Sequence, residues 1–382
     1  MAVTWQQAVA RRLERHALAT PAPGGAAAAA PVTAAMCGVH AQVASAAELS
    51  LALRIDGATR TLVTEALWTD RTLVKTRGPR GTVHLLAAVD LPMWTGALSL
   101  IPRPPYETAR DGLVTPEQAE QILAAIADAL RADDLTTDEL TDAIVARVGS
   151  WAGDRVMDAF QDKWPRWVML SGAAMRRGVM CFGPQRGRAV TYTSPARWLP
   201  GFAPLPGPAA VTTLVNHYLY AYGPATPEHF AKWLSVPKTW AAEQFAAAGL
   251  TKVSLEGAPA WVAAGDTTFP EKRATGVRLL PYFDAYAVGS HPRELLFPGA
   301  AYDRALARGQ AGNYPVLLVD GVVAGVWHQK RAGRRLQVTV EPLIDLSATR
   351  RRRLDEQVER MGEILEGVPT LTIGTVTSGP HA

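Results

Sequence analysis

The sequence predicts an α+β protein in which three tandem winged-helix units precede a β-rich, barrel-like C-terminal domain. Two patterns favour this class: helices followed by a hairpin recur three times, and the chain changes from helix-rich to strand-rich after Glu271. The 382 residues also exceed the roughly 250–300 that one hydrophobic core usually holds. The expected domains are winged-helix units over residues 1–105, 106–205 and 206–270, and the C-terminal domain over residues 271–382.

The first unit is the least regular copy. Helices are expected over residues 4–18 and 59–68, and a hairpin over residues 72–88. The segment 21–31, PAPGGAAAAAP, has low complexity and is expected to be a mobile loop without regular structure. Three cations surround the Gly78–Pro79 turn of the hairpin and are expected to contact DNA phosphates: Lys75, Arg77 and Arg80.

The second unit repeats the plan with helices over residues 116–131, 135–149 and 164–177. Its hairpin, over residues 178–195, has a glycine-bounded turn that holds Arg186, with Arg188 just beyond. Backbone phosphates are the usual partners of cations at such a tip. Two of the three hairpins therefore carry concentrated positive charge.

The third unit, over residues 211–264, is the clearest copy. Its first helix ends at Gly223, and the next begins with Thr226 as N-cap and a proline at the first helical position. A further helix spans residues 238–250, and a hairpin turns at Gly257. Paired helices and hairpins are common, so a coincidence of three approximate copies is the alternative interpretation.

The C-terminal domain is expected to contain strands over residues 277–289, 314–329 and 334–343, with a tight turn at Asp320–Gly321. An amphipathic helix follows over residues 349–367. Its run of four arginines suits a solvated face better than a binding site. The turn between the last two strands is expected to clamp phosphates or enter a groove through Gln329, Lys330, Arg331, Arg334 and Arg335.

The composition is that of a soluble globular protein, with 48% hydrophobic and 19% charged residues. No apolar run approaches the ~20 residues of a membrane span, and the N-terminus does not resemble a signal peptide, so a cytoplasmic protein is expected. Cys37 and Cys181 are far apart and are expected to be buried rather than to bind metal. No cofactor or metal site is indicated, and the absence of a dimerisation heptad favours a monomer.

Five segments of the chain carry a resemblance to a known family: CGVHAQVASAAELSLALR, PRGTVHLLAAVD, YGPATPEHFAKWL, LLPYFDAYAVG and GVVAGVWHQKRAGRRLQVTV. Together they resemble the helix-turn-helix family of AlkZ and YcaQ DNA glycosylases, and the resemblance covers nearly the whole chain. It implies three winged helices and a barrel-like domain around a DNA channel. The family's catalytic motif, Gln, an apolar residue, then Gln or Asp, falls at His40, Ala41 and Gln42, with His replacing Gln at the first position.

Gln at position 42 makes the chain more similar to the alkylation-resistance branch than to the Asp-bearing branch. That similarity implies a monofunctional glycosylase that removes bulky N7-alkylated purines from double-stranded DNA, including some interstrand crosslinks. Members of this branch often protect the producer of a genotoxic natural product from its own compound.

The residue types at positions 40 and 42 suit this chemistry. An N7-alkylguanine already carries the positive charge of a good leaving group, so the enzyme needs chiefly to position water and stabilise a cationic sugar. Gln42 offers an acceptor and two donors for water, and a neutral His40 can accept its proton. Side chains two residues apart share a side only in extended backbone, so residues 40–42 are expected outside a helix. A half-buried structural His40 and an ordinary polar Gln42 are the alternative.

Other residues compete for functional roles. Asp284, in an apolar aromatic segment, is a rival catalytic carboxylate, whereas His84 is expected to hydrogen-bond within the fold. Trp327 and His328 precede the basic turn and either seat it in DNA or belong to the core. At the level of the whole protein, the alternatives are a winged-helix transcriptional regulator, which would dimerise on a palindromic site, and a protein-interaction scaffold, which leaves the arginine-rich tips unexplained.

Overall fold

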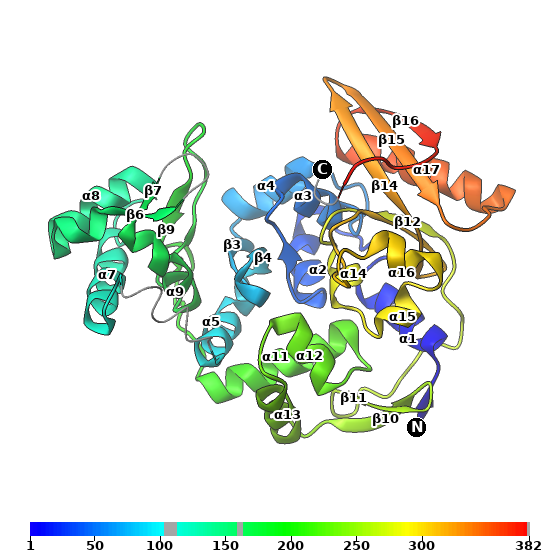
Figure 1. The fold of residues 1–382 in the computed structure, drawn as a ribbon, viewed down its shortest axis with the longest axis horizontal. Coiled ribbons are helices and arrows are strands. Elements are labelled where there is room, and N and C mark those ends of the chain that lie inside the picture. Colours follow the sequence, from blue (N-terminus) through cyan, green and yellow to red (C-terminus); the bar gives the residue numbers. More distant parts are fainter. Residues whose placement is uncertain (103–112, 159–162, 380–382) are drawn as a thin grey trace. The chain divides into compact units, whose positions relative to one another are not determined.

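A computed structural model describes residues 1–102, 113–158 and 163–379 and divides the chain into two compact bodies (Figure 1). The larger body comprises residues 1–66 and 215–382, and the smaller body comprises residues 67–214. The expected boundary between residues 105 and 106 lies outside the described residues. None of the described helices is long and apolar enough to cross a membrane.

Several helices of the larger body begin at a residue whose side chain caps the helix. Thr4 and Thr226 each accept a hydrogen bond from the third residue of the helix that follows, which satisfies an N–H that the helix itself leaves open. The expected helix start at Thr226 is therefore confirmed. The helices of this body, including two that extend into the smaller body, are α1 (Trp5–Arg15), α2 (Ala29–Ala35), α3 (Ala44–Ala52), α4 (Arg60–Trp68), α11 (Gly207–Tyr222), α12 (Pro227–Leu234), α13 (Lys238–Ala247), α14 (Ala285–Gly289), α15 (Arg293–Leu296), α16 (Ala300–Ala305) and α17 (Ala348–Ile364).

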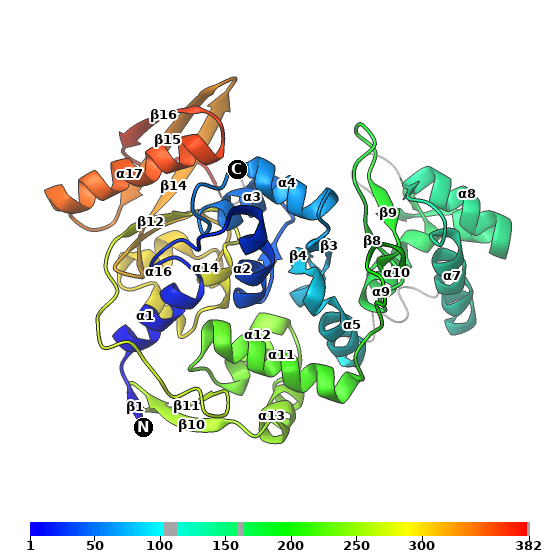
Figure 2. The ribbon, with the colours of Figure 1, turned by 180° about the vertical axis from the view of Figure 1, so that it is seen from behind.

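A curled five-stranded half-barrel forms the C-terminal part, with strand order β12-β13-β14-β15-β16. Neighbouring strands are antiparallel except β15 and β16, which are parallel because α17 connects them and packs against the sheet (Figures 1 and 2). The two-residue turn at Asp320–Gly321 is confirmed, with φ of 52° and 85°, as a tight hairpin requires. The strands are β12 (Val277–Leu280), β13 (Val316–Val319), β14 (Val322–Ala332), β15 (Arg335–Pro342) and β16 (Val368–Ile373).

A second sheet of the larger body joins the N-terminal strand β1 (Ala2–Val3) to the hairpin β10 (Thr251–Leu255) and β11 (Ala258–Val262). One core then unites α1 with this hairpin and with the half-barrel, through buried residues such as Val9, Val253 and Val326. The helix expected to open the first unit therefore packs against elements from the other end of the chain.

Two expectations for the larger body are wrong. The segment 21–31 is not a structureless loop: a 3-10 turn spans Gly25–Ala28 and α2 follows at once, because alanine is the residue most favourable to helix and this helix buries Val32. The strand expected over residues 277–289 ends at Leu280. Pro281 follows, and Asp284 caps the short helix α14 by accepting the N–H of Tyr286.

The smaller body has its own core around Ile122, Ile126, Leu140 and Trp167. The third helix expected here, over residues 164–177, forms only in part. Its first residues pair as a strand, a 3-10 turn covers Arg166–Leu170, and only the end is α-helical. The elements are β3 (Leu73–Arg77), β4 (Val83–Ala87), α5 (Leu91–Leu100), α7 (Pro116–Ala129), β5 (Leu135–Thr136), α8 (Thr137–Val148), β6 (Arg155–Asp158), β7 (Lys163–Pro165), α9 (Ser171–Arg176), β8 (Cys181–Phe182), β9 (Thr191–Thr193) and α10 (Pro195–Trp198).

Two buried histidines of the larger body, His16 and His291, and the half-buried His229 make its stability dependent on pH. The rings of His229 and His291 stack at 4.8 Å, and His16 lies between Tyr222 and Tyr286. Burial lowers the pKa of His229 to about 4 and that of His16 to about 3, and it also lowers the pKa of His291. Each of these imidazoles is therefore neutral in the folded protein at mildly acidic pH.

Acidification from pH 7 to pH 5 is expected to destabilise the protein. Below about pH 6.5, the ordinary pKa of histidine, the unfolded chain binds protons that the folded chain does not, so the free energy of unfolding falls by up to about 1.4 kcal/mol per pH unit for each histidine. Urea unfolding at several pH values measures this slope. His229→Gln should make it shallower, and equal stability at pH 7 and pH 5 would contradict the expectation.

Candidate active site

Residues 37–43 form an irregular connection between two helices. Helix α2 ends when the N–H groups of Cys37 and Gly38 donate to carbonyls of its last turn, at 2.9 and 3.0 Å. The two-residue strand β2 (Val39–His40) follows, and α3 begins only at Ala44. The expectation that residues 40–42 lie outside a helix is confirmed.

His40 and Gln42 differ in exposure. The His40 side chain is at the edge of the core, with 8% of the residue exposed, and its ring centroid lies 4.4 Å from that of Phe283. Gln42 is exposed, whereas Ala41 between them is buried. The segment thus presents a carboxamide to solvent beside an imidazole that is held by an aromatic ring. These are the groups needed to hold a water molecule and accept its proton.

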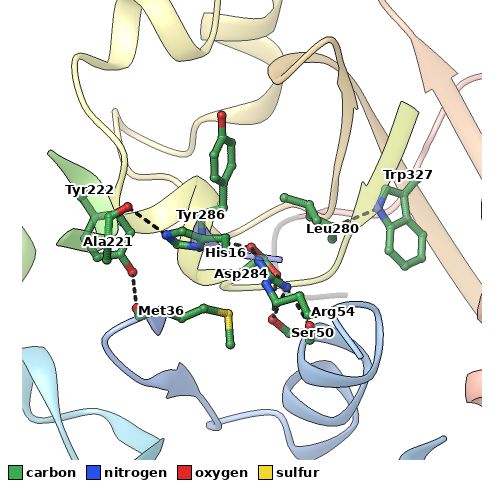
Figure 3. A network of polar contacts seen from close by, with 10 residues as sticks. All are labelled: His16, Met36, Ser50, Arg54, Ala221, Tyr222, Leu280, Asp284, Tyr286 and Trp327. Carbon is green, nitrogen blue, oxygen red and sulfur yellow. Dashed lines mark hydrogen bonds and ion pairs between the residues drawn. The ribbon is translucent and has the colours of Figure 1, made fainter. Parts of the chain in front are cut away.

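Helix α3, which begins two residues after Gln42, is anchored at its far end by a buried ion pair. The two terminal guanidinium nitrogens of Arg54, Nη2 and Nη1, donate to the carboxylate of Asp284, at 2.7 and 2.9 Å, and neither side chain is exposed (Figure 3). The Ser50 hydroxyl, one helical turn earlier, donates to the same carboxylate at 2.7 Å. Arg360 of α17 adds hydrogen bonds to carbonyls at the end of α3. Helix α3, which follows Gln42 in the sequence, is thereby fixed in the larger body.

Asp284 is unsuited to the rival catalytic role that the sequence left open. Burial opposes its ionisation, but Arg54, Ser50 and the N–H of Tyr286 outweigh burial and lower the pKa of the carboxyl. Its oxygens accept hydrogen bonds from these groups, and the residue is 1% exposed. The carboxylate is consequently a buried structural anion with no path to a substrate.

The backbone on both sides of the site is held by aromatic donors (Figure 3). The Tyr222 hydroxyl donates to the carbonyl of Met36, just before the irregular segment, at 2.7 Å. The Trp327 indole N–H donates to the carbonyl of Leu280, at the end of β12, at 2.9 Å. Trp327 is 2% exposed and belongs to the core, so it does not seat the basic turn in DNA.

The β14–β15 hairpin presents four exposed cations, and one of them, Arg331, also contacts the end of α17. Lys330, Arg334 and Arg335 are exposed around the two-residue turn. Arg331 donates to the carbonyl of Leu365 at 2.8 Å and so caps the end of α17. Gln329 is half-buried. Four of the five residues expected to contact DNA here are therefore exposed cations, the type of side chain that pairs with phosphate oxygens, and Arg331 among them also holds the end of α17.

The other two basic hairpin turns lie in the smaller body, and several of their cations contact other groups of the protein. Arg186 pairs with Glu139 at 2.9 Å and also donates to the carbonyl of Asp134, whereas Arg188 is exposed. In the β3–β4 hairpin, Lys75 lies 5.5 Å from the ring of Phe182 and Arg77 donates to the carbonyl of its own loop at Gly81.

Two further residues of the β3–β4 hairpin can be compared with the expectations. Arg80 is half-buried at a φ of 58°. His84 is buried and its Nδ1 lies 2.9 Å from the carbonyl of Thr82, so its expected hydrogen bond within the fold is confirmed.

Reasoning from the sequence missed the residues that frame the site. The PYFDAY segment directed attention to Asp284 and not to Phe283, which contacts His40. Arg54 lies in the apolar segment AELSLALR, where a charged residue four positions after a serine was an unused signal of a buried polar partner. Among the described residues, no group of three or more His, Cys, Asp and Glu is placed to hold a metal ion.

Comparison with known proteins identifies close relatives. The model of the AlkZ-like DNA glycosylase family matches residues 33–364. The chain is 34% identical over 350 residues to the interstrand DNA cross-link repair glycosylase of Streptomyces sahachiroi, a match that covers 86% of this chain and 88% of that protein. The solved structure of Streptomyces sahachiroi DNA glycosylase AlkZ is similar with a TM-score of 0.81 and 29% identity, covering 98% of this chain and 100% of that one.

Proposed function

Because the chain belongs to the AlkZ-like DNA glycosylase family, and therefore hydrolyses N-glycosidic bonds in DNA, we propose that its substrates are bulky N7-alkylated purines in duplex DNA, including interstrand crosslinks. The observation that carries this proposal is the 34% identity to a relative named for interstrand crosslink repair, over most of both chains. Its biological role is then the repair of DNA alkylated by a genotoxic natural product, or self-resistance to such a compound.

In the proposed mechanism, Gln42 and His40 act on the water that replaces the damaged base. The exposed carboxamide of Gln42 orients the water, and its dipole stabilises the sugar as positive charge develops there. His40 accepts the proton while its imidazole is neutral. The leaving N7-alkylpurine is already cationic and departs neutral, so no carboxylic acid is needed to protonate it.

The proposal includes three winged-helix units as the DNA-binding elements. Support comes from a feature shared by two of the copies: a strand residue before the second helix pairs with the second strand of the hairpin. In the smaller body β5 pairs with β9, and in the larger body Ala225 pairs with Trp261 of β11. This small sheet, in the order helix, strand, helix, helix, hairpin, is typical of winged helices.

The test is incubation of the protein with duplex DNA that carries one N7-alkylguanine, followed by alkaline cleavage of any abasic site. Strand cleavage at the adduct, absent from an unmodified duplex, is the expected result. Crosslinked duplexes provide the second substrate. Tight DNA binding without abasic sites on any cationic purine adduct would instead favour a winged-helix transcriptional regulator.

Arg334→Ala combined with Arg335→Ala is expected to weaken DNA binding and to flatten its salt dependence. Each lost phosphate contact reduces the slope of log K against log salt by about 0.9, so the double variant should lose about 1.8. Fluorescence anisotropy across a salt series measures the slope. Arg351→Ala with Arg352→Ala removes the same charge from exposed positions of α17, outside the winged-helix units, as a control. An unchanged slope in the hairpin variant would exclude the hairpin from the interface.

A further inference from the structure

We propose that Phe283 is a positioning residue for His40, and that the buried Asp284–Arg54 ion pair holds Phe283 in that position. The inference rests on the proposed function, which assigns His40 to the hydrolytic water. It adds to that function a reason why the imidazole keeps one orientation.

The contact between the two rings is direct. Their centroids are 4.4 Å apart and their planes are inclined by 35°, an arrangement in which one ring covers a face of the other. His40 is 8% exposed, so the covered imidazole has little room to rotate. A histidine that accepts a proton from a bound water must keep one ring nitrogen directed at it, and a misplacement of about 1 Å can cost about 10²-fold in rate.

The backbone at Phe283 is held in an unusual conformation. Its φ is 54°, in the left-handed region that residues with a β-carbon rarely adopt. Its N–H donates to the carbonyl of Gly312 at 3.0 Å, and a β-carbon at Gly312 would lie 2.9 Å from Cδ1 of the Phe283 ring. Such a conformation persists only where surrounding contacts fix it. The placement of the ring is therefore determined by its neighbours and not by local preference.

The next residue supplies the strongest of those contacts. Asp284 accepts hydrogen bonds from Ser50 and Arg54 of the α3 region, and α3 begins two residues after Gln42. One buried carboxylate therefore attaches the ring that covers His40 to the helix that follows Gln42. The Asp284–Arg54 ion pair thereby holds in place the neighbours of both groups proposed to share the water.

A double-mutant cycle between positions 40 and 283 tests the inference. Phe283→Ala is expected to lower the single-turnover rate of N7-alkylguanine excision by about 10–100-fold, while the Kd for the damaged duplex stays within about twofold. In the His40→Ala background the same substitution should change the remaining rate by less than about twofold, because its effect passes through His40. Equal losses in both backgrounds would show a general structural role and overturn the inference.

Conservative variants and a spectroscopic measurement separate positioning from folding. Phe283→Tyr keeps the ring and should retain most of the rate, whereas Phe283→Leu keeps bulk without the ring and serves if the alanine variant unfolds. Tyr302→Ala, an exposed aromatic of α16, is the matched control. The NMR signals of the His40 ring should shift in Phe283→Leu, and unchanged signals would contradict the contact.

The outcomes distinguish this inference from the proposed function. If the wild type excises no cationic purine, the proposed function fails and the inference with it. If His40→Ala keeps the wild-type rate, the assignment of His40 is wrong and Phe283 has nothing to position. If the wild type is active, His40→Ala is impaired and Phe283→Ala is unaffected, only the inference fails.

Discussion

Gln42→Ala is expected to lower the single-turnover rate of base excision by about 10²–10³-fold, the loss found when one preorganised polar group at a developing charge is removed. The residue is exposed on an irregular segment, so the substitution should leave folding and DNA affinity nearly unchanged. Methyl in place of carboxamide removes the acceptor and both donors that would orient water. Abasic-site formation under enzyme excess measures the rate without interference from product release.

Three further variants sharpen this experiment. Gln121→Ala, at an exposed position of α7, removes an amide where no role is proposed and should match the wild type. His40→Gln gives the commonest family pattern and can still hold water, but its amide cannot accept the proton, so its rate should fall between those of the wild type and His40→Ala. An excision rate for Gln42→Ala within threefold of the wild-type rate would exclude Gln42 from the mechanism. A different residue would then have to orient the water.

Asp284→Asn is expected to destabilise the larger body by about 3–5 kcal/mol, because it leaves the Arg54 guanidinium buried without its counter-charge. Neither side chain of the pair is exposed, so water cannot compensate. The amide still fills the space, which confines the change to charge and hydrogen bonding. Tryptophan fluorescence in a urea titration measures the loss of stability.

The matched control removes both members of the pair. Arg54→Met with Asp284→Leu leaves no buried charge and should recover most of the lost stability, because well-packed apolar groups often replace a buried ion pair at little cost. A single-variant loss below about 1 kcal/mol, typical of an exposed pair, would show that Arg54 finds another partner or reaches solvent.

Local signals in the sequence predicted local structure well. Thr226 begins α12, Asp320–Gly321 forms a two-residue turn, and the basic hairpin turns at Gly333 and Arg334, because capping and turn chemistry depend on near neighbours. The low-complexity segment 21–31 was misjudged since its alanines favour helix once a core is available to bury Val32.

The site was predictable only in part, because some of its contacts join residues that are far apart in the sequence. The spacing of His40 and Gln42 and the family resemblance located the irregular segment. The Arg54–Asp284 pair joins residues 230 positions apart, and no local pattern specifies such a partner. Phe283 lies in a segment that was expected to be a strand. A strand has no residue in the left-handed region, so that expectation predicted neither the backbone of Phe283 nor its contact with His40.

The packing of α1 determines when, during synthesis of the chain, this helix can join its core. Val9 shares one core with Val316 and Val326, so a ribosome must translate more than three hundred codons before the N-terminal helix meets its final neighbours. Residues 67–214 are continuous in sequence and meet their own core partners while synthesis is still under way. Until the half-barrel is synthesised, the apolar face of α1 lacks these neighbours and is apolar surface of the kind that promotes aggregation.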